Sequence, residues 1–115
     1  MSQNCIFCKI VAGQIGGKLL YQDDQVTAFR DINPQAPTHI LLIPNKHITS
    51  TSHALEEDQA ILGKLLLTAA QVAKQENVAD SGYRLVINKG EHGGQTVFHL
   101  HVHLLAGRPM TWPPG

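Results

Sequence analysis

The 115-residue sequence has no excess of charge of either sign, no long apolar run and only two cysteines. Nine Lys and Arg residues balance nine Asp and Glu residues, so the basic surface that nucleic acids attract is not predicted. No apolar run approaches the ~18 residues of a membrane span, and the N-terminus lacks a basic stretch followed by an apolar one. We therefore expect a cytoplasmic protein that binds neither nucleic acid nor a membrane.

Internal repeats and low-complexity segments are also absent. Hydrophobic residues make up 43% of the chain and charged residues 16%, which is typical of a globular protein and excludes disorder. A chain of this length is expected to fold as one domain, spanning residues 1–115. Cys5 and Cys8 lie close together, and in a reducing compartment this spacing favours a metal site or a redox pair over a structural disulfide.

The periodicity of apolar residues predicts an α+β domain with a mainly antiparallel sheet of about five strands. A short N-terminal helix is expected over residues 4–12, capped by Asn4. One long helix is expected over residues 55–76, with Ser52 as the candidate N-cap, because apolar residues recur there at three-and-four spacing. The strands are expected at residues 19–21, 26–30, 39–44, 83–88 and 97–105.

The last of these strands carries three histidines in strict alternation with apolar residues. A strand sends successive side chains to opposite faces, so His99, His101 and His103 are expected on one face. The opposite, core-facing stripe would consist of Phe98, Leu100, Val102 and Leu104. Histidine is the side chain most easily poised between its neutral and charged forms near neutral pH. We therefore expect the chemistry of the protein at this strand.

Three interpretations of these histidines stay open from residue types alone. They could face solvent, or one or two of them could ligate zinc, although three in a row lie too far apart to reach one ion. Alternatively, a neutral imidazole could attack phosphorus while protonated neighbours stabilise the phosphoryl oxygens and protonate the leaving group. The preceding loop at residues 93–96 favours this last interpretation, because its glycines let backbone N–H groups approach an anion and its Thr adds a hydroxyl donor.

Longer motifs resemble those of the histidine triad (HIT) family, in particular its histidine triad nucleotide-binding branch of purine nucleoside phosphoramidases. Besides the triad itself, they are CIFCKI (5–10), AFRDINPQAPTH (28–39), IPNKHI (43–48), GGQTV (93–97) and WPPG (112–115). The resemblance covers nearly the whole chain and implies a HIT-like α+β fold. It also implies hydrolysis of the P–N bond of purine nucleoside 5′-phosphoramidates, which join AMP or GMP to an amine, through a covalent nucleotidyl-histidine.

The resemblance assigns catalytic roles to four residues. It implies that His101 is the nucleophile and that His103 holds the phosphate and the leaving group. His39 would belong to the same proton-handling cluster, and Thr96 would bind the α-phosphate together with its loop. The remaining members of this phosphate-binding group would be Asn88, Gly94, Gln95 and Val97.

The same resemblance implies how the nucleoside and a second subunit are bound. Asp31 would accept hydrogen bonds from the ribose hydroxyls, although taken alone it could equally be a turn or cap residue. The apolar slot for the base would consist of Ile6, Phe7, Ile10, Phe29 and Ile32. Relatives form homodimers by joining sheets edge to edge, which protects the edges. Trp112, in the tail at residues 108–115, would then contact the site of the partner.

Cys5 and Cys8 fit half of a tetrahedral zinc site. The resemblance completes this site with His47 and His99, and the zinc would be structural, pinning the N-terminal helix to the sheet. The alternative is that both cysteines are small buried hydrophobes.

Three other functions stay open. The chain could be a non-catalytic nucleotide-binding or scaffolding module that acts through protein partners, or a zinc-dependent hydrolase with its metal at the triad. Hydrolysis of dinucleoside polyphosphates, as in a neighbouring branch, is disfavoured by the short chain and its WPPG ending. Two departures from the branch pattern, Thr96 in place of the more frequent Ser and Gly16-Gly17 in place of an Ile-Pro-type turn, remove no catalytic group.

Overall fold

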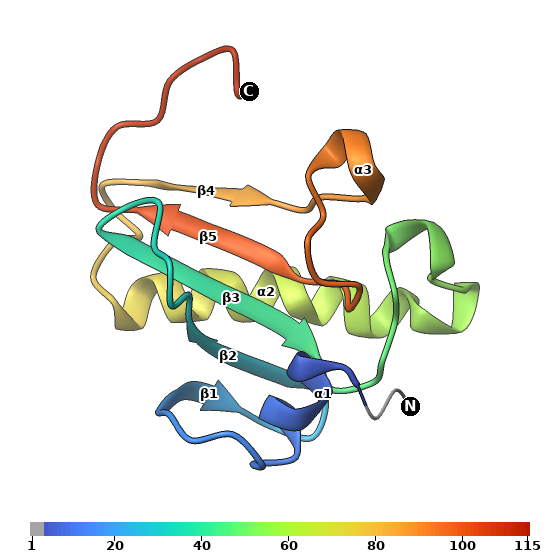
Figure 1. Cartoon of the computed structure of the whole chain (residues 1–115). Coiled ribbons are helices and arrows are strands. Elements are labelled where there is room, and N and C mark those ends of the chain that lie inside the picture. Colours follow the sequence, from blue (N-terminus) through green and yellow to red (C-terminus); the bar gives the residue numbers. More distant parts are fainter. Residues whose placement is uncertain (1–3) are drawn as a thin grey trace.

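The computed structural model describes residues 4–115, which form a five-stranded sheet with helices on both faces (Figure 1). The order of strands across the sheet is β1-β2-β3-β5-β4, and every neighbouring pair is antiparallel. The strands are β1 (Leu19–Gln22), β2 (Val26–Arg30), β3 (Thr38–Pro44), β4 (Tyr83–Val86) and β5 (Val102–Ala106). The predicted α+β class and antiparallel sheet are confirmed.

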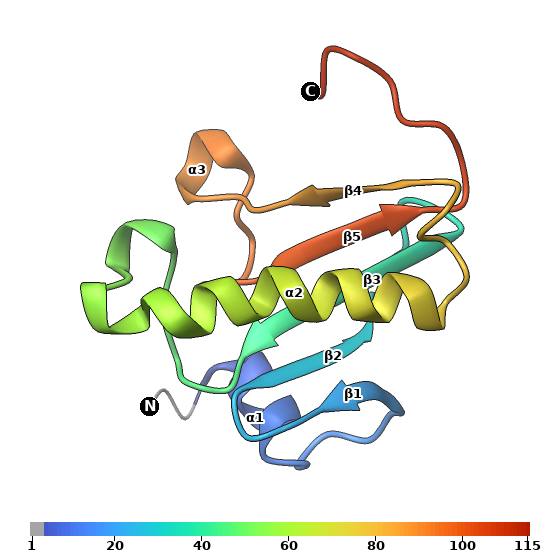
Figure 2. The same ribbon diagram turned by 180° about the vertical axis from the view of Figure 1, so that it is seen from behind.

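Helix α1 (Ile6–Val11) lies on one face of the sheet, and the long helix α2 (Gln59–Gln75) crosses the other face (Figure 2). Two short 3₁₀ helices, η1 (Thr51–His53) and η2 (Glu56–Asp58), precede α2, and the four-residue helix α3 (Gly90–Gly93) lies between β4 and β5. The prediction of a short N-terminal helix and one long helix is confirmed. Among the helices of residues 4–115, none combines the length and the apolarity that crossing a membrane would require.

The central strand β3 is apolar on both faces because a helix covers each of them. Leu42 is fully buried in the cluster that contains Leu65 and Val72 of α2. Its neighbour Leu41 points to the opposite face and packs with Phe7 of α1. An unbroken apolar run is the pattern expected of a strand buried on both sides. The sheet therefore has one face that serves the main core and another that, beside α1, is free to build a site.

Two helix starts predicted from capping residues are wrong. Cys5, not Asn4, is the N-cap of α1, and its sulfur accepts a backbone N–H of the first turn at 3.3 Å. Helix α2 begins at Gln59, later than predicted, and Ser52 lies in η1 instead. The cause is Asp58, whose carboxylate accepts hydrogen bonds from a backbone N–H and from a lysine and so holds the preceding segment as a separate turn.

The strand predicted over residues 97–105 is wrong in its first half, because β5 begins only at Val102. The preceding residues bend, and Phe98, expected in the core, is 60% exposed. The backbone N–H of Leu100 donates to the carbonyl oxygen of Ile48 at 2.6 Å, so the loop after β3 holds this segment. The first histidine of the triad is thereby separated from the other two.

Candidate functional site

A cavity of about 590 Å³ lies between α1, the end of β2 and the segment that leads into β5. Most of the residues predicted to bind substrate line it: Ile6, Phe7, Ile10, Phe29, Asp31, Ile32, Thr96, Val97 and His103, together with the predicted nucleophile His101. Residues 15–20, Arg30 and Leu41 also line the cavity and were not predicted. Of the residues not predicted to line the cavity, the sequence analysis singled out only Gly16 and Gly17, as a departure from the family pattern.

Four residues predicted to bind substrate do not line this cavity: Asn88, Gly94, Gln95 and Trp112. The side chain of Gln95 is buried and braces its own loop, since its Nε2 donates to the carbonyl oxygen of Thr49 at 2.8 Å and its Oε1 accepts the N–H of Gly90 at 3.0 Å. Trp112 is 81% exposed, with the guanidinium of Arg84 at 5.8 Å from its ring centre. Their contacts with a substrate stay predictions.

The hydrogen of His101 is placed by the backbone. Its Nδ1 lies 2.8 Å from the carbonyl oxygen of His99, and because a carbonyl oxygen only accepts, Nδ1 carries the hydrogen. A neutral imidazole then has its lone pair on Nε2. The ring of Phe7 packs edge-on against His101, with ring centres 5.2 Å apart, and holds its orientation. In its neutral form, His101 therefore presents the lone pair of Nε2 at the wall of the cavity.

Hydrogen bonds also determine which ring nitrogens of His39 and His103 carry a hydrogen. The backbone N–H of Gln35 donates to Nδ1 of His39 at 2.9 Å, so the hydrogen of His39 is on Nε2. That Nε2 lies 2.9 Å from Nδ1 of His103 and 3.4 Å from Oδ2 of Asp31. Because Nδ1 of His103 accepts, its own hydrogen is on Nε2. The cavity wall therefore combines a lone pair on His101 with an N–H on His103.

Burial keeps this pair of histidines neutral near pH 7. Desolvation lowers the pKa of His103 to about 4, repulsion from His101 and His39 adds to this effect, and the carboxylate of Asp31 opposes it. Desolvation also lowers the pKa of His39, again against the attraction of Asp31. Asp31 is therefore the negative charge that counters the cost of a proton on either ring.

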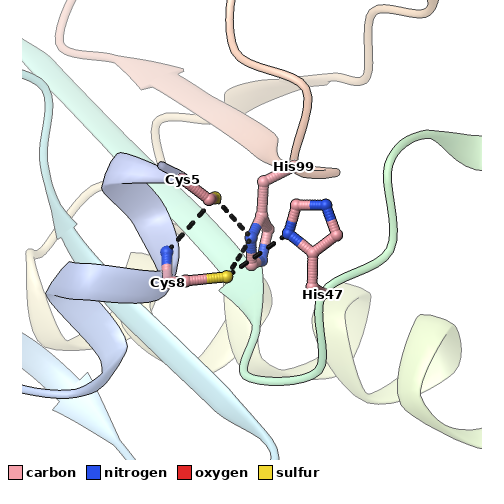
Figure 3. Close-up of side chains that lie close together, drawn as sticks. All are labelled: Cys5, Cys8, His47 and His99. Atoms are coloured by element: carbon pink, nitrogen blue, oxygen red, sulfur yellow. Dashed lines mark hydrogen bonds between the residues drawn. The ribbon is translucent and has the colours of Figure 1, made fainter. Parts of the chain in front are cut away.

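Cys5, Cys8, His47 and His99 converge beside the cavity (Figure 3). Nδ1 of His99 lies 3.3 Å from the sulfur of Cys5 and 3.6 Å from that of Cys8, and Nδ1 of His47 lies 3.3 Å from the sulfur of Cys8. Tetrahedral zinc, with ~2.3 Å bonds to sulfur and ~2.0–2.1 Å bonds to nitrogen, separates these atoms by about 3.6 Å. The donor atoms and their spacing fit this ion.

His99 is held in the form that ligates a metal. Its Nε2 lies 2.8 Å from the carbonyl oxygen of Pro44 and so carries the hydrogen, which leaves the lone pair on Nδ1 toward the two sulfurs. Desolvation lowers the pKa of His99 to about 4, so the ring stays neutral at pH 7. Such a carbonyl contact is the usual support of a ligating histidine.

Asp31, His39 and His103 form a second group of nearby ligand atoms, but the hydrogen bonds disfavour a metal there. A neutral imidazole must carry one hydrogen. Nδ1 of His39 faces the N–H of Gln35, so its hydrogen occupies Nε2, the atom that would have to bind the ion. This geometry counts against a zinc-dependent hydrolase with its metal at the triad.

We expect the protein to lose stability on acidification between about pH 6.5 and pH 4. In this range histidines of the unfolded chain, with the usual pKa of 6.5, take up protons, whereas His103 in the folded protein takes one up only near pH 4. The unfolded state then binds more protons, so the free energy of unfolding falls as the pH falls. Urea unfolding at several pH values gives the free energy of unfolding as a function of pH. This free energy should depend less steeply on pH in His103→Gln, while His92→Gln, at an exposed position, should keep the wild-type dependence. Equal slopes in all three proteins would contradict this assignment.

Comparison with known proteins identifies the family of the chain. The HIT domain family matches residues 12–110. The chain is 51% identical over 110 residues to the purine nucleoside phosphoramidase of Escherichia coli K12, covering 96% of this chain and 92% of that protein. It is 52% identical over 115 residues to an uncharacterised HIT-like protein of Synechocystis, with both chains covered completely.

Solved structures of the family share the fold. A HIT family hydrolase from Legionella pneumophila superposes with a TM-score of 0.94 at 49% identity, covering 97% of this chain and 100% of the other. A histidine triad protein from Clostridium difficile gives 0.93 at 40% identity, covering 96% of both chains. With a family match over most of its length and relatives of this similarity, the chain belongs to the HIT domain family.

Proposed function

We propose that this protein hydrolyses the P–N bond of purine nucleoside 5′-phosphoramidates and releases AMP or GMP and an amine. The observation that carries the proposal is the pairing of a lone pair on His101 with an N–H on His103 at one apolar cavity. A nucleophile beside a proton donor is what displacement at phosphorus requires. The relation to a protein named purine nucleoside phosphoramidase supports the choice of substrate.

In the first step, Nε2 of His101 forms a bond to phosphorus and the bond from phosphorus to the amine breaks. The electron pair of that bond goes to the amine nitrogen, which takes the Nε2 proton of His103. A bound phosphoryl anion favours a second proton on the neighbouring imidazole, so His103 donates as an imidazolium and becomes neutral. Its remaining hydrogen is then on Nδ1, and Nε2 is free to act as a base.

In the second step, a water oxygen attacks phosphorus and passes its proton to Nε2 of His103. The bond from phosphorus to His101 breaks, and its electron pair returns to Nε2 of His101. The hydrogen bond from Nδ1 of His101 to the carbonyl oxygen of His99 persists throughout and keeps the ring in place. Both histidines are restored, and the sum of the steps is the addition of one water across the P–N bond.

The nucleoside is proposed to fill the apolar part of the cavity. Asp31 would accept the ribose hydroxyls at the rim, and Thr96 would donate to the α-phosphate. The walls proposed to hold the base are Ile6, Phe7, Ile10, Phe29 and Ile32. The Gln95 side chain would brace the phosphate loop through its hydrogen bonds to Gly90 and Val97. The other residues proposed to bind the phosphate with this loop are Asn88, Gly94, Gln95 and Val97.

Replacing the nucleophile should separate chemistry from binding. We expect His101→Ala to lower kcat for an AMP–amine conjugate by about three orders of magnitude or more. AMP affinity, measured by calorimetry, should change much less, and His92→Ala at an exposed position should resemble wild type in both assays. Unimpaired hydrolysis by His101→Ala would overturn the proposal. Nucleotide binding without any hydrolysis in the wild type would instead support a scaffolding module.

We further propose that zinc is the metal of the cluster formed by Cys5, Cys8, His47 and His99. When bound, it would supply no chemistry to the reaction but a cross-link between α1 and the segment before β5. Ile6 and Phe7 of α1 line the cavity, so this cross-link would hold one wall of the nucleotide site in place.

Metal analysis of the purified protein should find about one zinc per chain. We expect Cys8→Ser to lose most of this zinc and to unfold at a lower temperature, because a thiolate ligand is removed. His92→Ala, which removes a histidine outside the cluster, should keep both properties. Full zinc content in Cys8→Ser would contradict the assignment.

A homodimer is proposed on the basis of the open sheet. Strands β1 and β4 are its edges, and the C-terminal tail leaves the sheet on the β4 side, where Arg84 donates to the carbonyl oxygen of Thr111 at 2.8 Å (Figure 1). Trp112 on this tail is exposed in the single chain. Sheet pairing at an edge would let the tail, residues 108–115, reach the cavity of the partner.

Sedimentation should give about twice the 12.6 kDa mass of the chain. Deletion of residues 110–115 should change turnover or the preference among amine leaving groups, because Trp112 would no longer reach the neighbouring site, while circular dichroism stays unchanged. Unchanged kinetics across several leaving groups would refute a role for the tail.

A further inference from the structure

We propose that Asp31 is a positioning residue for the proton donor His103, in addition to its contact with ribose. Its carboxylate lets the His39–His103 pair hold the extra proton that the leaving amine consumes. This inference rests on the proposed function, since it concerns how the same site supplies that proton.

The imidazole rings of His39 and His103 share one hydrogen bond. Nε2 of His39 and Nδ1 of His103 are 2.9 Å apart, which is hydrogen-bond distance and requires one of the two nitrogens to accept. In the neutral pair His103 accepts. When His103 becomes an imidazolium, its Nδ1 also carries a hydrogen, and two N–H groups then face each other at this distance.

His39 cannot resolve this conflict by moving its hydrogen to its other nitrogen. Its Nδ1 already accepts the backbone N–H of Gln35 at 2.9 Å. Its side chain is 3% exposed, so water does not readily replace the lost acceptor. The hydrogen on Nε2 of His39 needs another acceptor nearby, and Oδ2 of Asp31 lies 3.4 Å away.

The position of Asp31 suits this second role. It directly follows β2, its backbone N–H donates to the carbonyl oxygen of His39 at 3.0 Å, and its Oδ1 accepts the N–H of Asn33 at 2.8 Å. The carboxylate is thus oriented from both sides, with Oδ2 directed to the histidine pair. The titratable groups around the pair are Asp31 after β2 and His101 before β5, and Asp31 is the negative one.

The two roles of Asp31 predict different kinetics. A residue that only binds ribose affects substrates that have ribose hydroxyls, whatever their leaving group. In the first step, a residue that sustains the proton donor affects substrates whose leaving group needs a proton, whether or not they have ribose hydroxyls. The second step is common to all substrates, so the first step has to be measured alone. An amine must be protonated to leave, whereas p-nitrophenolate is stable without a proton.

The test uses four substrates and the full-length protein: adenosine 5′-phosphate joined to a primary amine or to p-nitrophenol, each with ribose or with 2′,3′-dideoxyribose. We expect Asp31→Asn to lower the single-turnover rate of leaving-group release, measured with enzyme in excess, about tenfold or more for both amine substrates, and less than about threefold for both p-nitrophenyl esters. The matched control Asp80→Asn, at an exposed aspartate of the α2–β4 connection, should leave all four values unchanged.

The pH profile gives a second measure. In wild type, the single-turnover rate of amine release should fall as the pH rises through the pKa of the pair in the complex, and Asp31→Asn should move this fall to lower pH because a stabilising negative charge is lost. His39→Gln provides an independent variant, for which the same difference between amine and ester substrates is expected.

Loss confined to the ribose substrates, with KM raised and kcat unchanged for both leaving groups, would overturn the inference and leave Asp31 as a ribose ligand only. Equal losses of the single-turnover release rate for amines and esters would also overturn it. Failure of the wild type to hydrolyse the amine substrates would overturn the proposed function instead.

Discussion

The hydrogen bond between Nδ1 of His101 and the carbonyl oxygen of His99 is the contact on which the rest of the site depends. It determines which nitrogen of His101 is free, and it exists because the chain bends before β5 instead of continuing as a strand. In a regular strand this carbonyl would point sideways to a neighbouring strand. Here the same bend directs the ring of His99 to Cys5 and Cys8. One irregular segment therefore serves the proposed nucleophile and the candidate metal site together.

The two faces of the sheet have different tasks. The face under α2 holds the larger hydrophobic cluster, and none of the buried residues of that cluster lines the cavity. The face under α1 has a smaller cluster of Phe7, Phe29, Leu41 and Ile43, and Phe7, Phe29 and Leu41 of this cluster also line the cavity. Side chains do not fill this second face completely, because α1 is short and covers only part of it. The unfilled space is the cavity.

Much of this could be predicted from the sequence. The apolar stripe of α2 and the continuous apolar run of β3 reflect burial on one and on two sides, so periodicity identified both elements. The four residues of the metal cluster and most of the cavity wall were identified through motifs, because those residue types occur at family positions. Sequence reasoning failed where alternation is ambiguous: His99, Phe98 and Leu100 alternate like a strand, and nothing local shows that Ile48 takes the hydrogen bond of Leu100. Bonds between segments far apart in the chain, such as that from Gln95 to Thr49, leave no periodic signal.

The contact between Gln35 and His39 involves the main chain of residue 35 and not its side chain. The direction of the hydrogen on His39, and with it that of His103, is therefore independent of which amino acid occupies this position, proline excepted, because proline has no N–H. The side chain at residue 35 can therefore vary without changing this contact. The path of the loop between β2 and β3 therefore determines which nitrogen of His39 carries the hydrogen, whichever side chain other than proline stands at residue 35.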